Sequence, residues 1–139
     1  MQVLPYLDFE GSAEQAANFY QATLGAEILA LMHFSDAPDP DMCNTGSADK
    51  VMHMSLKIGD SILMGSDGRC SGKAVFQGVS LALNLTDAAE ATRLFTLLAE
   101  GGEVQMPLEK TFFSPAFGLV ADRFGVSWMI YVEFPEGRR

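Results

Sequence analysis

An internal repeat constrains the fold of this chain more than any other feature. Four residues around the end of an expected helix recur 76 positions later as the same or a similar residue: Phe19 and Phe95, Gly25 and Gly101, Glu27 and Glu103, and Ile28 and Val104. Two residues at an expected hairpin recur after 66 positions: Gly59 and Gly125, and Ser61 and Ser127. The ten-residue difference falls in stretch 36–50, whose Asp and Pro content is typical of a loop. We therefore expect two copies of one structural unit.

One helix is predicted in each half. Across residues 12–24 small and apolar side chains recur at helical spacing, Ser12 and Gln15 fit a capping box, and Gly25 supplies a left-handed stop. Across residues 87–100 an apolar stripe follows the acidic start typical of a helix, and two glycines come directly after it. These signals place a helix at the same point of each repeat.

Each helix follows one predicted strand and precedes three more. The strands expected in the first half are residues 3–10, 27–35, 51–58 and 61–66, and those in the second half are 79–85, 103–113, 117–122 and 127–134. Gly59-Asp60 and Phe124-Gly125 are hairpin signals before the last strand of each half. The sequence thus predicts an α+β fold of two tandem βαβββ modules.

Composition narrows the classes of partner. The chain has 139 residues, 48% of them hydrophobic, and a formal net charge of -9, so it can build a core but offers no clustered cations. We expect neither nucleic acid nor an anionic membrane surface as partner. No apolar run would span a bilayer and no signal peptide is visible at Met1, so a cytoplasmic location is expected. Cys43 and Cys70 lack metal-site spacing and are expected to be free thiols.

Several segments resemble one branch of a known superfamily. They are residues 5–9 (PYLDF), 17–27 (ANFYQATLGAE), 51–67 and 111–130. Together they resemble the PhnB-like proteins of the vicinal-oxygen-chelate superfamily, which includes glyoxalase I, bleomycin-resistance proteins and extradiol dioxygenases. The resemblance implies a single glyoxalase-like domain over 1–139, with modules at about 1–68 and 76–135. It also implies cupped mixed or antiparallel sheets with the helices outside, and a homodimer.

The resemblance also indicates where a metal would lie. Catalytic members of the superfamily hold a divalent ion with a His or Gln on the first strand of each module and a Glu on the last. Those positions fall on Pro5 and Ser80, and on Leu63 (or Met64 with a one-residue slip) and Met129. None of these residues is a suitable ligand for such an ion. We therefore expect neither the superfamily's metal nor another cofactor.

Other residues are candidates for binding or catalysis. His53 alternates with Ser55 and Lys57 and is a candidate general acid or base, or a ligand-holding residue, if the methionines beside it face the helix. His33, near the end of a strand, is expected to be solvated. An alternative metal pair of His33 and His53, with Asp67 or Asp8, depends on a register that the sequence does not give. The residues expected to bind a ligand are Tyr6, His53, Asp67, Phe112, Phe113, Phe117, Trp128 and Met129.

These observations favour three functions in turn. The first is a protein that binds a small apolar or aromatic molecule in a cupped cavity without metal, because the aromatic residues suit such a ligand. The second is an isomerase, lyase or dioxygenase-type enzyme that uses His53 or non-standard metal ligands. The third is a structural dimer whose core is filled.

Overall fold

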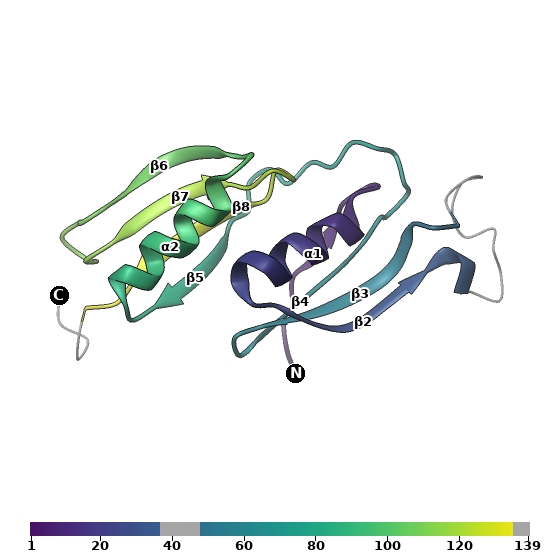
Figure 1. Ribbon diagram of the computed structural model, residues 1–139, viewed down its shortest axis with the longest axis horizontal. Helices are drawn as coiled ribbons and strands as arrows, with labels where there is room; N and C mark the ends of the chain where they lie inside the picture. The colour runs from purple at the N-terminus through teal and green to yellow at the C-terminus, as the bar shows by residue number, and fades with distance from the viewer. Residues whose placement is uncertain (37–47, 135–139) are drawn as a thin grey trace. The chain divides into compact units, whose positions relative to one another are not determined.

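The computed structural model describes residues 1–36 and 48–134 (Figure 1). The chain divides into two compact units, Met1–Val75 and a second that begins at Phe76. Each unit contains one copy of the repeated series of elements, so each is described by itself.

The first unit is a four-stranded sheet with one helix. Its elements are β1 (Tyr6–Asp8), α1 (Ala13–Leu24), β2 (Glu27–His33), a short 3-10 helix η1 (Phe34–Asp36), β3 (Val51–Ile58) and β4 (Ser61–Ser66). The strand order is β1-β4-β3-β2. β1 pairs with β4 in parallel, and the other two pairings are antiparallel.

The second unit repeats this connectivity. Its elements are β5 (Leu81–Leu85), α2 (Ala88–Ala99), β6 (Glu103–Glu109), β7 (Phe117–Ala121) and β8 (Ser127–Val132). The strand order is β5-β8-β7-β6, with β5 parallel to β8 and the remaining pairs antiparallel. The order of first, last, third and second strand is therefore the same in both sheets. The predicted α+β fold of two βαβββ modules is confirmed.

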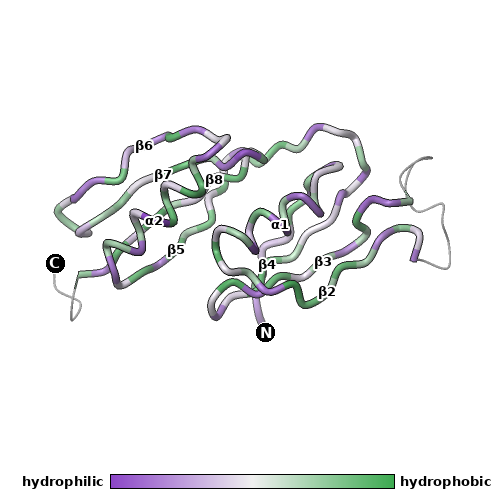
Figure 2. Tube along the Cα trace, viewed as in Figure 1, coloured by the Kyte–Doolittle hydropathy of each residue, from purple (hydrophilic) through white to green (hydrophobic). Residues whose placement is uncertain are grey.

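Each helix packs on one face of its own sheet (Figure 1). On β8 the buried residues Trp128, Ile130 and Val132 alternate with three half-buried ones, as expected for a strand with one face in a core. α2 buries an apolar stripe, and its opposite side is polar (Figure 2). The cores thus lie between helix and sheet, and the other face of each sheet carries the remaining strand residues.

Several predicted ends of elements are corrected by the structure. The first strand is shorter than residues 3–10, and the second ends in η1, where the Asp36 carboxylate accepts the amide of His33. The strand expected over 103–113 ends at Glu109, because the residues after it enter a turn in which the amide of Thr111 donates to the carbonyl of Ser114. β3 and β4 have the predicted ends.

The start of α1 also differs from the prediction. Ser12 makes no side-chain capping hydrogen bond, so the expected capping box does not form. The carboxylate of Asp67, which follows β4, instead accepts the amides of Gly11 and Ala13 at 2.8 Å. The helix is capped by a residue more than fifty positions away, which local sequence patterns do not reveal.

Two further findings concern Cys70 and the two α-helices. Cys70 is in a disulfide bond, so the expectation of a free thiol is wrong for this residue. The spacing of cysteines in the sequence does not show which sulfurs the fold brings together. Cys43 lies outside the described residues. Neither α1 nor α2, the α-helices of the described ranges, is long and apolar enough to cross a membrane.

Candidate functional site

The side chains that point away from the helices form one face on each sheet. We call them the first face and the second face. In the first unit the strand register places these residues together: Tyr6, Asp8, Met64, Ser66, Ser55, His53, Ala30 and Met32. In the second unit the corresponding set is Ala82, Asn84, Ser127, Met129, Tyr131, Phe117 and Leu119. The two sets have the same layout because the two sheets have the same topology.

A hydrogen-bonded pair of rings dominates the first face. The hydroxyl of Tyr6 on β1 lies 3.0 Å from Nδ1 of His53 on β3, so the two side chains meet across β4. Their rings are stacked, with centroids 5.7 Å apart and planes 27° from parallel. Tyr6 is 46% exposed and His53 is half-buried. The predicted site residues Tyr6 and His53 are thus brought together on a surface that solutes can reach.

The second face is aromatic where the first is polar. Tyr6 pairs with Met64 in β4, and in the second sheet Ala82 pairs with Met129. Ser55 on β3 pairs with Met64, and Leu119 on β7 pairs with Met129, so Ser55 and Leu119 hold the same position in the two sheets. His53 and Phe117 each lie two residues before them, so these two residues correspond as well. One copy of the repeat therefore carries a phenol and an imidazole where the other carries a methyl group and a phenyl ring.

The family's metal-ligand positions are filled by residues that do not fit a divalent ion. Leu63 is buried in the core, so the position on the helix-free face is Met64, as the one-residue slip allowed. Met64 and Met129 offer only thioethers, which hard divalent ions do not prefer. The carbonyl of Pro5 accepts the amide of Met64, and the hydroxyls of Ser80 and Ser127 are 2.8 Å apart. In the described ranges no three His, Cys, Asp or Glu side chains are grouped to hold a metal.

Four aromatic rings form a cluster on the second face. The ring of Phe113 lies edge-on to Phe117 with centroids 5.0 Å apart and is stacked on Tyr131 at 6.3 Å. Phe112 packs against Phe113 at 5.2 Å, and its side chain is 88% exposed. Sequence reasoning missed Tyr131, although its alternation with Met129 along β8 is the signal that identifies it. We call Phe112, Phe113, Phe117 and Tyr131 the aromatic cluster.

A buried serine holds the aromatic cluster in place. The hydroxyl of Ser114 lies 2.6 Å from the carbonyl oxygen of Val132 and 2.8 Å from that of Ala116, and it accepts the amides of both residues. Thr111 closes the turn around Phe112 and Phe113, because its amide donates to the carbonyl of Ser114. The turn therefore presents Phe112 from an ordered backbone.

Replacing Ser114 with Ala should lower the free energy of unfolding by about 1–3 kcal/mol, because buried backbone groups lose their partner. It should also speed hydrogen exchange at the amides of Thr111 and Phe113, which NMR measures directly. A Thr92→Ala change in α2, where the hydroxyl is exposed, serves as the control. Unchanged exchange in the Ser114 variant would show that the hydroxyl does not order the turn.

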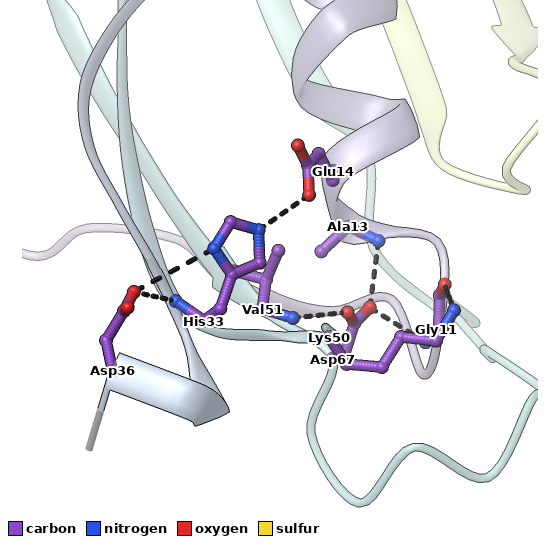
Figure 3. A network of polar contacts seen from close by, with 8 residues as sticks. All are labelled: Gly11, Ala13, Glu14, His33, Asp36, Lys50, Val51 and Asp67. Carbon is purple, nitrogen blue, oxygen red and sulfur yellow. Dashed lines mark hydrogen bonds and ion pairs between the residues drawn. The ribbon is translucent and has the colours of Figure 1, made fainter. Parts of the chain in front are cut away.

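Two predicted ligand residues lie in the cores. Trp128 is 2% exposed, and its indole N–H donates to the carboxylate of Asp122 at 2.9 Å. It cannot share a face with Met129, since adjacent residues of a strand point in opposite directions. Asp67 is 1% exposed, and besides the two amides at the start of α1 its carboxylate accepts the amide of Val51 at 2.8 Å (Figure 3). These contacts describe structural positions for both side chains.

The two histidines point to opposite faces of the first sheet. His53 pairs with Met32, and the next residue of β2, His33, turns toward α1. There Nε2 of His33 donates to Glu14 at 2.8 Å, and Asp36 lies 3.8 Å from Nδ1 (Figure 3). The alternative metal pair of His33 and His53 is therefore not brought together, and His33 is an ion-pairing residue instead of a merely solvated one.

The Glu14 partner raises the pKa of His33 above its ordinary value of 6.5, through the hydrogen bond first and through charge second; Asp36 and Asp49 add to the effect. Because the pKa of His33 is higher in the folded than in the unfolded protein, the ion pair stabilises the fold. This contribution is fully present below about pH 6.5 and is lost as the pH rises through the raised pKa. The pair is partly exposed, so we expect it to contribute at most about 1 kcal/mol to the free energy of unfolding. In Glu14→Gln, NMR titration should show a lower His33 pKa than in the wild type. An equal pKa in both proteins would contradict the pairing.

The fold and the helix-free faces define a class of protein. A glyoxalase-related enzyme from Fulvimarina pelagi (22% identity, TM-score 0.61) and the fosfomycin resistance protein FosX from Listeria monocytogenes (10% identity, TM-score 0.68) have the same fold over 96% and 100% of this chain, and over 88% and 98% of theirs. The protein therefore has a glyoxalase-like α+β fold.

The family follows from closer matches. Residues 1–131 match the PhnB-like family described as 3-demethylubiquinone-9 3-methyltransferase, and the chain belongs to this family. Protein YjdN of Escherichia coli (strain K12) is 37% identical over 95% of both chains. The crystal structure of protein PA1353 from Pseudomonas aeruginosa is 42% identical, with a TM-score of 0.86 over 96% of this chain and 98% of that one. A PhnB protein from Bacillus cereus, named as a putative 3-demethylubiquinone-9 3-methyltransferase, is 28% identical, with a TM-score of 0.79 over 95% and 99%.

Proposed function

We propose that this protein binds a small apolar or aromatic molecule on the helix-free faces, without the superfamily's usual metal ion. The observation that carries the proposal is the aromatic cluster, in which an almost fully exposed Phe112 stands beside three partly exposed rings. Rings held at fixed geometry suit a flat apolar ligand, because aromatic pairs gain energy beyond the area that they bury.

The rest of the second face supports this proposal. Met129 and Leu119 lie beside the cluster as cross-strand neighbours, and polar groups lie at one end, where the hydroxyl of Ser127 donates to Gln105. A mainly apolar surface with a few placed polar groups is typical of small-molecule sites. Methionine adapts its shape to different ligands, which favours a range of related molecules over one.

Metal independence is part of the proposal. The thioethers of Met64 and Met129 at the family's ligand positions support it. Affinity for an aromatic probe should be the same before and after treatment with EDTA, measured by isothermal titration calorimetry. A loss of affinity that zinc or manganese restores would contradict the proposal.

Binding should depend on Phe112. We expect Phe112→Ala to weaken the affinity for 2-naphthol about two- to tenfold, the equivalent of roughly 0.5–1.5 kcal/mol for one aromatic contact. The fold should be unaffected, because the side chain is exposed. Val79→Ala removes another exposed apolar side chain of the second unit and is the matched control. Equal affinities of both variants and the wild type would exclude the aromatic cluster as the binding surface.

A second candidate function is catalysis by His53. The hydrogen bond between Tyr6 and His53 supports it, because a general acid or base needs a partner that holds its ring. Methyl transfer, the activity in the family's description, belongs to this candidate as well. Turnover of a substrate that is abolished in His53→Gln, while binding is kept, would favour the enzyme over the binding protein.

We also propose a homodimer. Val104 and Met106 are exposed on the edge strand β6, and Leu29 and Met32 on the edge strand β2, and exposed apolar edges need cover. Light scattering of the purified protein should give twice the chain mass of 15.1 kDa. A monomer at micromolar concentration would exclude the dimer.

A further inference from the structure

We infer that Tyr6 fixes His53 in the tautomer that carries its proton on Nε2, and that the first face thereby recognises an acceptor oxygen on a neutral ligand. This inference rests on the proposed binding function and assigns it a chemical class of ligand. It makes Tyr6 a positioning residue and His53 the group that touches the ligand.

The tautomer follows from the acidity of the two partners. The hydrogen bond joins the Tyr6 hydroxyl and Nδ1 of His53 at 3.0 Å, and either atom has a proton to offer. A phenol is a far stronger acid than the N–H of a neutral imidazole, so the phenol is the donor. A neutral imidazole has one N–H, and with Nδ1 acting as acceptor the proton is on Nε2.

The geometry leaves that proton for a ligand. The stacked rings, 5.7 Å apart, hold the plane of the imidazole as well as its Nδ1 atom. Among the residues that the structure describes, Nε2 of His53 has no hydrogen-bond partner. An N–H on a half-buried ring is a donor whose partner must come from water or from a bound molecule.

Neighbouring charges select a neutral oxygen. Ser66 on β4 pairs with Asp8 on β1. Its neighbour Gly65 pairs with Met54 on β3, which places Ser66 opposite His53, so Ser66 lies between Asp8 and His53 on the first face. The hydroxyl of Ser66 donates to the Asp8 carboxylate at 3.2 Å, which keeps this negative charge near the site. An anionic ligand would be repelled by Asp8 and by the net charge of -9, and a cationic head such as an ammonium has no lone pair to accept the hydrogen bond from the His53 N–H. A ketone, ester or amide oxygen meets neither penalty.

Apolar contacts complete the site. Met32 is the cross-strand neighbour of His53 and is 39% exposed, and Met64 pairs with Tyr6 on the other side. The ring of Tyr6 is itself partly exposed. A neutral carbonyl compound with an apolar or aromatic body therefore matches the chemistry of the first face better than an acid or a hydrocarbon.

The tautomer is testable without any ligand. The chain has two histidines, so His33→Gln leaves only the ring of His53 in a histidine-labelled sample. At pH 8.5, above the ordinary range of imidazole titration, two-bond proton–nitrogen spectra should show a protonated Nε2 and an unprotonated Nδ1. In Tyr6→Phe, which keeps the stacked ring, the two tautomers should mix. A protonated Nδ1 in the Tyr6 protein, or identical spectra with and without the hydroxyl, would overturn the inference.

The ligand class is tested with three probes of similar size. We expect acetophenone to bind at least about fivefold more tightly than ethylbenzene or benzoate, the ratio of roughly 1 kcal/mol for one hydrogen bond. This preference should fall in Tyr6→Phe and vanish in His53→Phe, with chemical shifts at Met32 and Met64 as the readout. Equal affinities for all three probes would overturn the inference and leave the proposed binding function standing. No shift at either face with any probe, 2-naphthol included, would overturn both.

Discussion

Replacing Asp67 with Ala is expected to lower the free energy of unfolding by about 3–5 kcal/mol, the largest effect of any single polar change in the first unit. The carboxylate accepts the amides of Gly11, Ala13 and Val51, each at 2.8 Å, and is almost fully buried. It joins the end of β4 to the start of α1 and the start of β3. Without it, three backbone donors lose their acceptor and the helix loses an anion at its N-terminus.

A denaturation series tests this role. Asp67→Asn keeps the size and one acceptor oxygen but turns an NH2 group toward a backbone N–H, so it should also be destabilised, by less than Asp67→Ala. Asp60→Asn, at the exposed hairpin between β3 and β4, is the matched control and should change stability by less than about 0.5 kcal/mol. Circular dichroism in urea measures all three. An Asp67→Ala protein as stable as the control would mean that water replaces the carboxylate at no cost.

Replacing Trp128 with Ala is expected to destabilise the second unit by about 3–5 kcal/mol. The indole is buried in the core of the second unit, and its N–H is paired with Asp122. The other carboxylate oxygen of Asp122 accepts the amides of Phe124 and Val126 in the hairpin before β8. The change removes a large core side chain and leaves Asp122 with one donor fewer. Urea unfolding followed by circular dichroism measures the loss.

The same residue separates a core role from a binding role. Trp128→Phe fills most of the volume, so it should cost less stability than Trp128→Ala and leave the affinity for 2-naphthol within about twofold of the wild type. Phe112→Ala should do the reverse and weaken binding at constant stability. Weaker binding in Trp128→Phe with an unchanged free energy of unfolding would place the indole in the site, as sequence reasoning first suggested.

The fold was largely predictable because the local signals for helices and strands agree with the internal repeat. Helical spacing and glycine stops locate α1 and α2, and the residues that recur after 76 and 66 positions assign each strand to a repeat. The errors lie where long-range contacts replace local signals. Asp67, not Ser12, caps α1, and Asp36 ends β2 through a hydrogen bond to His33.

The candidate site was predictable in part. Tyr6 and His53 were expected to bind a ligand, but their contact depends on the position of β1 beside β4, which no pattern in the sequence gives. For Trp128 and Met129 the period of a strand alone shows that only one can lie on each face. Packing decides which of these two residues points toward α2. Gly118, which pairs with Ile130, leaves room for the ring of Phe95 on the helix side of the sheet.

A titration of the methyl-labelled protein with 2-naphthol, followed by NMR of the methionines, tests whether the helix-free faces bind a ligand. Of the eight methionines in the chain, Met64 lies on the first face and Met129 on the second, whereas Met54 is fully buried in the core of the first unit. We predict saturable shifts for the methyl groups of Met129 and Met64, and none for Met54. Shifts confined to Met54, or no saturable shift at Met64 or Met129, would contradict the claim that the helix-free faces are the binding surface.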